Sequence, residues 1–287
     1  MNLMKFRWIL LFVIVLLVFW YNYMTKLAGS GGDVKSSLSL PGYVRITPGK
    51  MDQFLDIHNK QCALVSSSGQ MLNAGLGKEI DKADFVIRMN NAPTQGFERD
   101  VGNKTSLRVV SHTTVPWLLK NEIHYFQQSA STIYVIWGPE NKMRQDGKGP
   151  IFNALMKVAK KYPNVKLYAV TRKKIQDCDN IFQNETGKNR MQSGAFLSTG
   201  FFTMILAMDI CDNIQVYGMI NDSYCGQVKH KRVPYHYYEK SWIDECRMYN
   251  AHEKARHGGH RFITEKAIYA RWASQKHVYF KNPSWAL

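Results

Sequence analysis

Short apolar runs alternate with amphipathic stretches from Cys62 almost to the C-terminus. The short apolar runs predict buried strands, and apolar residues that recur every third or fourth position predict helices. The predicted strands are 63–66, 85–89, 107–110, 133–137, 165–170, 214–219 and 277–280, and the predicted helices are 72–80, 151–161, 199–211 and 262–273. Strands that alternate with helices predict an α/β sandwich around a mainly parallel sheet. Such sheets bind ligands at the carboxyl ends of their strands.

A different pattern occupies the N-terminus, where no charged residue occurs from Trp8 to Tyr23. This stretch is near the lower limit of about 17 residues that cross a bilayer. We expect a cytoplasmic tail at 1–7 and a transmembrane signal anchor at 8–24, since Lys5 and Arg7 precede the apolar run. The alternative is a signal peptide cleaved near Ala28. With either reading the rest of the chain is exported.

The segment after the anchor is rich in glycine, serine and proline, which predicts a flexible stem over residues 25–57. Residues 58–287 then form a single lumenal domain. Three glycosylation motifs begin at Asn103, Asn184 and Asn221, as expected for an exported surface. In an oxidising lumen the five cysteines form at most two intrachain bridges and leave one over.

The amino-acid composition excludes several classes of protein. The 287 residues are 45% apolar, which excludes disorder as the dominant state, and five cysteines are too few for a disulfide scaffold of this length. The formal net charge of +16 predicts attraction to an anionic partner. A nucleic-acid binder is opposed by the anchor, the glycosylation motifs and the dispersed basic residues, so we expect no nucleic-acid partner.

Polar residues follow two of the predicted strands. Ser66, Ser67 and Ser68 end the first strand, and Asn90 ends the next. Hydroxyls and backbone amides at a strand-to-helix turn can hold a phosphate, and a side-chain amide beside them can orient a ribose or base. The alternative is an ordinary polar turn.

A second polar segment opens the predicted helix 199–211. Ser198 or Thr199 is a good N-cap, and the helix behind it directs its positive dipole end and free amides outward. An anion could dock there. The alternative is a capping motif with a structural role.

A third candidate segment lies in the C-terminal region. His260 follows two glycines ahead of a predicted helix, where an imidazole can exchange protons near neutral pH. A zinc-protease helix does not fit, because His257 lies one residue too far from His252 and Glu253. Asp177-Cys178-Asp179 has the acidic-x-acidic form that holds Mg²⁺ or Mn²⁺ in many sugar-nucleotide transferases, but it is a short and frequent pattern.

Taken together, these segments resemble the animal sialyltransferases, glycosyltransferase family 29. Four segments in the family's order carry the resemblance: Cys62 to His112 (long sialylmotif), Ser193 to Met219 (short motif), His236 to Glu239 (motif three) and His260 to Glu265 (very short motif). The last two segments are most similar to the N-acetylgalactosaminide α2,6-sialyltransferases.

The resemblance implies a metal-independent variant of the GT-A fold, no cofactor, CMP-sialic acid as donor and inversion at the anomeric carbon. It implies transfer to the 6-hydroxyl of GalNAc in already sialylated Galβ1,3GalNAc, on glycoproteins or gangliosides, by a type II Golgi membrane enzyme. Two alternatives are a sialyltransferase of another linkage or acceptor and an inactive lumenal carbohydrate-binding relative.

The resemblance also implies residue roles. His260 is the general base, and His236 helps to stabilise the leaving phosphate. The donor contacts fall on Ser67, Asn90, Ser198, Thr199, Gly200 and His236, with support from Glu265, Tyr237 and Ser111. Glu265 either orients or stabilises a helix start or is a solvated first-turn acid.

One of the two expected disulfides follows from the same resemblance. Cys62 and Cys211 match the family's bridge between the long and short motifs, and we expect Cys225 to pair with Cys246, leaving Cys178 free. Two positions depart from galactoside-specific members, which have Asn where Ser111 stands and Cys where Tyr235 stands. The first departure argues against a galactose 6-hydroxyl as the acceptor.

Overall fold

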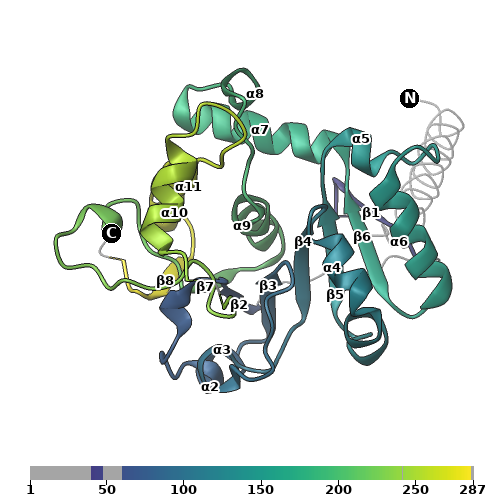
Figure 1. Cartoon of the computed structure of the whole chain (residues 1–287), viewed down its shortest axis with the longest axis horizontal. Helices are drawn as coiled ribbons and strands as arrows, with labels where there is room; N and C mark the ends of the chain where they lie inside the picture. The colour runs from purple at the N-terminus through teal and green to yellow at the C-terminus, as the bar shows by residue number, and fades with distance from the viewer. Residues whose placement is uncertain (1–39, 48–59, 241, 286–287) are drawn as a thin grey trace, which may run out of the picture. The chain divides into compact units, whose positions relative to one another are not determined.

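The computed structural model describes residues 40–47, 60–240 and 242–285. Its centre is an eight-stranded sheet in the order β1-β6-β5-β4-β3-β2-β7-β8 (Figure 1). Only β1 pairs antiparallel, with β6, and the other neighbours are parallel. The strands are β1 (Tyr43–Arg45), β2 (Gln61–Val65), β3 (Phe85–Met89), β4 (Leu107–Ser111), β5 (Ile133–Trp137), β6 (Lys166–Val170), β7 (Asn213–Tyr217) and β8 (Val278–Asn282). The mixed, mostly parallel α/β sheet predicted from the sequence is confirmed.

The central strands are buried along almost their whole length because both faces of the sheet are covered. Successive residues of one strand enter different cores: Leu64 packs in one hydrophobic cluster, whereas Ala63 and Val65 pack in another. The same alternation divides Val135 from Tyr134 in β5. Each strand therefore anchors a helix layer on both sides of the sheet.

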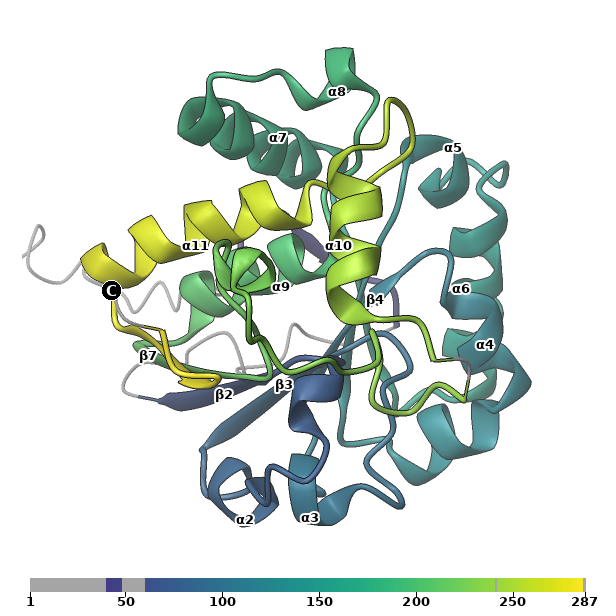
Figure 2. The same cartoon turned by 60° about the vertical axis from the view of Figure 1, so that its left-hand side comes forward.

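One layer holds α7 (Arg172–Thr186), α9 (Thr199–Ile210) and α11 (Phe262–Gln275). The opposite layer holds α2 (Gly77–Ile80), α3 (Glu98–Val101), α4 (Val115–Lys120), the π-helix η3 (Ile123–Gln128) and α6 (Pro150–Lys161). Figure 2 shows α9 and α11 on one side of the strands and α2 and α3 on the other. Shorter elements complete the chain: η2 (Gly69–Met71), α5 (Glu140–Met143), α8 (Arg190–Ser193), η4 (Tyr224–Gly226) and α10 (Glu245–Glu253).

Helix α9 is the centre of its layer. Its residues Phe201 to Ala207 are all buried, as expected for a helix that is hydrophobic on every side. A disulfide joins Cys62 in β2 to Cys211 at the end of α9. This bridge ties the long-motif and short-motif segments together. Cys225 pairs with Cys246, and Cys178 is a buried free thiol whose pKa burial raises to about 12.

The helix predicted over residues 72–80 is wrong. The chain forms η2, an irregular turn and the four-residue α2 instead. Asn73 and Gly75 have positive φ angles of 61° and 68°, and their backbone N–H groups donate to the Asp100 carboxylate. Left-handed residues cannot continue a right-handed helix, so the apolar spacing marks a turn packed on the core.

The first strand of the sheet lies inside the segment that the sequence assigns to the stem. Tyr43–Arg45 pairs with Val170 to Tyr168, and the compact unit begins at Leu40. Three residues beside Pro41 and Gly42 are too few to show a strand pattern in the sequence. The predicted anchor, residues 8–24, lies outside the described residues. Within the ranges that the structure describes, no helix is long and apolar enough to cross a membrane.

Candidate active site

A cavity of about 1510 Å³ lies where the parallel strands β2 to β6 end. It opens at the edge of the sheet where the sequence predicts a ligand. The predicted site residues that line it are Ser67, Asn90, Ser111, Ser198, Thr199, Gly200, His236, His260 and Glu265. Segments far apart in the sequence therefore converge on one cavity. Of the predicted catalytic, donor-binding and supporting residues, Tyr237 is not among the lining residues.

The serine turn after β2 is fixed by its neighbours. Ser66 Oγ donates to the carbonyl of Gly218 at 2.6 Å, and Ser68 caps η2 by accepting from the N–H of Gln70. The carbonyl of Ser67 accepts from the N–H of Tyr237 at 2.9 Å. Tyr237 is buried and its hydroxyl donates to Pro93, so it holds the turn from behind and has a supporting role.

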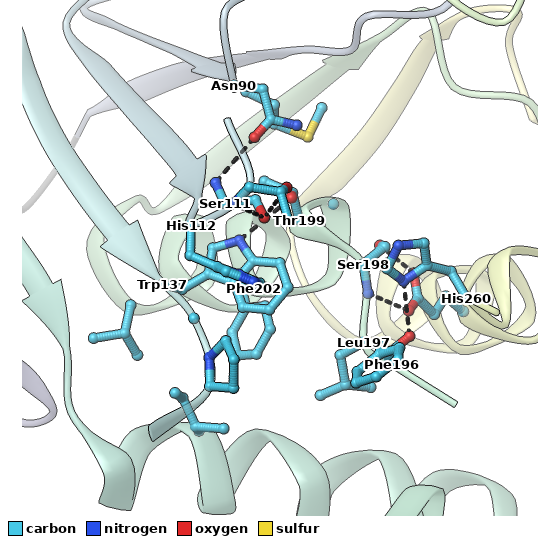
Figure 3. Close-up of a pocket in the computed structure, with 18 of the residues that line it drawn as sticks. Asn90, Ser111, His112, Trp137, Phe196, Leu197, Ser198, Thr199, Phe202 and His260 are labelled. Atoms are coloured by element: carbon cyan, nitrogen blue, oxygen red, sulfur yellow. Dashed lines mark hydrogen bonds between the residues drawn. The ribbon is translucent and has the colours of Figure 1, made fainter. Parts of the chain in front are cut away.

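Asn90 and Ser111 form the next part of the wall. Asn90 has a φ of 48°, a conformation that asparagine tolerates better than most residues. Its Oδ1 accepts from the N–H of Ser111 at 3.0 Å, as the dashed line in Figure 3 marks. The Asn90 amide nitrogen is thereby oriented away from β4.

The start of α9 is capped twice. Ser198 Oγ accepts from the N–H of Phe201 at 3.0 Å, and the Ser198 hydroxyl donates to the carboxylate of Glu265. The N–H of Ser198 donates to the same carboxylate at 2.8 Å. The Ser198 hydroxyl proton is therefore occupied within the protein. Thr199 Oγ1 accepts from Trp137 Nε1 at 3.3 Å, which leaves its own proton available to a ligand (Figure 3).

Glu265 is a buried acid, with 2% of its surface exposed. Burial raises its pKa from the ordinary value of 4.5 to about 7, although the two bonds from Ser198 favour the ionised form. The interpretation of Glu265 as a solvated first-turn acid is therefore wrong. Glu265 belongs to α11 but fixes the start of α9, so it joins the very short motif to the short motif.

His260 lies beside that helix start. Its Nδ1 lies 2.9 Å from the carbonyl oxygen of Phe196, so this nitrogen carries the proton and donates. The other ring nitrogen, Nε2, then has a lone pair to accept a proton. Burial lowers the pKa of His260 below its ordinary value of 6.5, which keeps the imidazole neutral. The His252 ring stacks on it at 5.4 Å.

His236 lies on the loop that the Cys225–Cys246 bridge closes. Its Nδ1 is 2.6 Å from Glu239 Oε1, and its ring stacks on Tyr238 with centroids 5.2 Å apart. The carboxylate accepts from Nδ1–H and orients the ring.

The acidic pattern in α7 does not form a metal-binding pair. Residues two apart on a helix point in nearly opposite directions. Asp179 pairs with Arg190 at 2.5 Å, whereas Asp177 pairs with the exposed Lys173 at 3.3 Å. Among the residues that the structure describes, no group of three or more His, Cys, Asp or Glu side chains could hold a metal ion.

Sequence reasoning missed a buried polar network behind the cavity. Glu245, 1% exposed, accepts from Gln70 Nε2 at 3.1 Å and from the Tyr249 hydroxyl at 2.8 Å. Lys266 lies 4.0 Å from the centroid of the Tyr249 ring, and its burial lowers its pKa. These residues brace α10 and α11 against the serine turn. Lys266 follows Glu265 directly, but nothing in the sequence marks either charge as buried.

The glycosylation motifs lie outside the cavity lining. Asn103 and Asn184 are exposed, and Asn221 is half-buried with its Oδ1 bonded to Ser223 Oγ. Carbohydrate at any of the three remains a prediction.

Fold and site together define an α/β protein with a polar cavity at the strand ends and a neutral histidine beside a helix start. The chain belongs to glycosyltransferase family 29, the sialyltransferases, whose sequence model matches residues 33–277. The resemblance inferred from the four motifs is thus confirmed, as is the assignment as a glycosyltransferase.

Curated relatives agree with that family. The chain is 51% identical over 257 residues to a human alpha-N-acetyl-neuraminyl-2,3-beta-galactosyl-1,3-N-acetyl-galactosaminide alpha-2,6-sialyltransferase, covering 90% of this chain and 84% of the relative. It is 51% identical over 246 residues to human alpha-N-acetylgalactosaminide alpha-2,6-sialyltransferase 3, covering 86% and 79%.

A solved structure supports the fold. The crystal structure of a mammalian sialyltransferase in complex with Gal-beta-1-3GalNAc-ortho-nitrophenol matches with a TM-score of 0.54 and 21% identity. The match covers 83% of this chain and 75% of that chain. At 21% identity, the similarity between the two proteins establishes a shared fold only.

Proposed function

We propose that the protein transfers sialic acid from CMP-sialic acid to the 6-hydroxyl of GalNAc in sialylated Galβ1,3GalNAc, with inversion and with His260 as the general base. The printed activity of the 51% identical human relative supports this acceptor and linkage. We also propose the metal-independent variant of the GT-A fold, whose α/β architecture the mainly parallel sheet supports. The cavity is larger than the several hundred Å³ of a typical single-ligand pocket, which suits two substrates at once.

The observation that carries the mechanism is the bond between His260 Nδ1 and the Phe196 carbonyl at 2.9 Å. It fixes the tautomer in which Nε2 accepts the proton. In the reaction the acceptor oxygen forms a bond to the anomeric carbon of sialic acid while the bond from that carbon to the phosphate oxygen breaks. The hydroxyl proton passes to His260 Nε2, and CMP leaves with the electron pair.

The leaving group is stabilised by hydrogen-bond donors that the protein has already oriented. The Thr199 hydroxyl and the free N–H groups at the start of α9 supply positive potential for the CMP phosphate, and the His236 ring lines the same cavity. The donor carries a single phosphate, which is esterified to both cytidine and sialic acid, and one carboxylate. We therefore propose that no divalent ion is needed to neutralise it.

The location of the enzyme rests on the sequence. We propose a single-pass type II protein of the Golgi membrane, anchored by residues 8–24, with the domain in the lumen and with glycoprotein or glycolipid acceptors. The uncharged stretch from Trp8 to Tyr23 supports the anchor.

The test uses the detergent-solubilised full-length chain. Radiolabelled CMP-sialic acid is offered with α2,3-sialylated Galβ1,3GalNAc and, in parallel, with unsialylated Galβ1,3GalNAc. We expect labelled product from the sialylated acceptor, with the new residue on GalNAc O6 by linkage analysis. Product with another linkage, or no CMP release above that without acceptor, contradicts the proposal and favours a different sialyltransferase or a binding protein.

A further inference from the structure

His112 is a cavity residue to which neither the sequence motifs nor the relatives assign a role. It follows Ser111 directly at the end of β4 and lines the cavity. Its ring stands edge-on to Trp137, with centroids 6.2 Å apart, and Figure 3 shows the two side chains together. The N–H of His112 donates to the Trp137 carbonyl at 2.8 Å. The imidazole is thus held between the ends of two neighbouring strands.

The space for this ring exists because residue 138 is glycine. A Cβ at Gly138 would lie 2.6 Å from His112 Cβ and 3.2 Å from His112 Nδ1. One side of the imidazole therefore packs directly on the backbone of β5. Replacement of Gly138 by alanine must displace the ring.

The same packing determines which nitrogen carries the proton. Nδ1 is buried and has no hydrogen-bond partner among the described residues. A buried N–H without a partner is rarer in proteins than a buried acceptor without one. Burial and the nearby charge of Lys142 lower the pKa of His112 and keep the ring neutral. Because Nδ1 has no acceptor within reach in the described parts of the chain, the single proton of the neutral ring resides on Nε2.

The surroundings favour an anion at Nε2–H. Lys142 contributes positive potential from α5. On one side Ser111 bonds Asn90 at 3.0 Å, and on the other Trp137 bonds Thr199 at 3.3 Å. His112 therefore adjoins two residues, Ser111 and Trp137, that bond the predicted donor contacts Asn90 and Thr199.

We propose that His112 donates a hydrogen bond from Nε2 to an anionic group of the sugar nucleotide, either its phosphate or its sialic acid carboxylate. The proposal rests on the proposed function, because it needs CMP-sialic acid in the cavity. It adds to His260 and His236 a third histidine that touches substrate. Gly138 then acts as a positioning residue for His112.

The experiment is calorimetric titration of the full-length protein in detergent with three ligands: cytidine, CMP and CMP-sialic acid. The variants are His112→Ala and Gly138→Ala, and the matched control is His124→Ala, an exposed histidine outside the cavity lining. Thermal unfolding of each variant establishes that it is folded. Gly138→Ala keeps the imidazole but moves it, so the two variants test chemistry and position separately.

We expect His112→Ala to weaken binding about 10- to 100-fold, as for loss of a hydrogen bond to a charged group. Equal loss for CMP and CMP-sialic acid assigns the phosphate, and loss for CMP-sialic acid with unchanged CMP assigns the carboxylate. In either case we expect cytidine binding to stay unchanged, and Gly138→Ala to lose affinity for the same ligands as His112→Ala. Wild-type affinity of folded His112→Ala for both anions, or an equal loss for cytidine, overturns the proposal. Absence of CMP binding by the unsubstituted protein instead refutes the proposed function.

Discussion

In the proposed mechanism His260 Nε2 accepts the proton of the acceptor hydroxyl, because Nδ1 already donates to the Phe196 carbonyl. We expect His260→Ala to lower kcat about 10²- to 10⁴-fold, the usual loss for a general base, with little change in CMP affinity. Initial rates with labelled CMP-sialic acid measure the effect. The matched control is His230→Ala, because His230 Nδ1 also bonds a backbone carbonyl, at 2.8 Å, but lies outside the cavity lining. Full activity in folded His260→Ala would remove His260 from the mechanism.

The same residue predicts the pH dependence of the reaction. Burial lowers the pKa of His260 below 6.5, so the neutral, proton-accepting form persists into mildly acidic conditions. Activity is lost only as pH falls through that lowered pKa. We expect the acid limb of kcat/KM to lie below pH 6.5, measured on the purified protein with both substrates varied. An acid limb clearly above pH 6.5 contradicts this assignment.

Glu265 predicts a pH effect on stability rather than on rate. Its pKa rises on folding from 4.5 to about 7, so between these values the folded state binds more protons than the unfolded state. The contribution of this group to stability is therefore greatest at low pH and falls as pH rises from about 4.5 to 7. We expect Glu265→Gln to reduce that fall, as measured by thermal unfolding at pH 5 and pH 7.5. The control is Glu122→Gln, a surface residue with 31% of its side chain exposed and paired with Lys161. Equal pH profiles for Glu265→Gln and the wild type would refute the assignment.

At the level of single residues, the sequence indicates chemistry better than environment. His260 could be identified because it follows two glycines ahead of a helix, and Ser198 because it begins a helix. The burial of Glu265 and its bond to Ser198 depend on α11 crossing the start of α9, a contact between residues 67 apart. His112 lies inside the quoted long motif, but its unpartnered nitrogen appears only once Gly138 is placed beside it.

Among the elements, α9 depends on its N-cap. Ser198→Ala removes the acceptor for the Phe201 N–H and one donor to buried Glu265. We expect a loss of about 0.5–2 kcal/mol of stability from the cap, and weaker CMP binding because the helix start loses its position. Denaturant unfolding and CMP titration measure the two effects. Ser198→Thr, which keeps the hydroxyl, should restore most of both, and failure of Ser198→Ala to change either would refute the capping role.

The loop closed by Cys225 and Cys246 carries His236, and the bridge joins residues 21 apart. Loss of a disulfide that closes a loop of this length costs about 3 kcal/mol of stability, because the unfolded chain gains conformational entropy. We expect Cys225→Ser/Cys246→Ser to be less stable by about that amount and to bind CMP more weakly, since His236 loses its orientation. Thermal unfolding and calorimetry test this. Unchanged CMP affinity in a folded double variant would show that the bridge stabilises the fold but does not orient His236 for binding.

Elements buried on both faces are the ones that the sequence predicts well. The strands 85–89 and 133–137 agree with β3 and β5 at both ends, because mostly apolar runs of that length fit a covered parallel sheet. The predicted helix 72–80 failed because Asp100, distant in sequence, binds the turn at Asn73 and Gly75. Strand β1 could not be predicted, since three residues form a strand there only through pairing with β6.

At the scale of the whole molecule, the site is an assembly of strand ends and loops rather than a local motif. The serine turn, Asn90, the start of α9, the His236 loop and the start of α11 reach one cavity because a parallel sheet brings its carboxyl ends to the same edge. The Cys62–Cys211 bridge fixes two of these segments to each other. Ligand binding should therefore stabilise the domain as a unit.

The stabilisation of the domain by bound CMP can test whether the protein or a divalent ion neutralises the phosphate. CMP at 100 times its Kd should add about 2.7 kcal/mol by mass action, which corresponds to a rise in Tm of roughly 5–10 °C for a domain of this size. The protein's own donors neutralise the phosphate in the proposed mechanism, so EDTA should leave the rise unchanged and added Mn²⁺ should not increase it. Differential scanning calorimetry of the full-length protein, with and without CMP, checks this. A Tm rise that disappears in EDTA and returns with Mn²⁺ would contradict the mechanism. It would also require ligands other than the Asp177 and Asp179 pair, whose carboxylates point to different sides of α7 and bind Lys173 and Arg190.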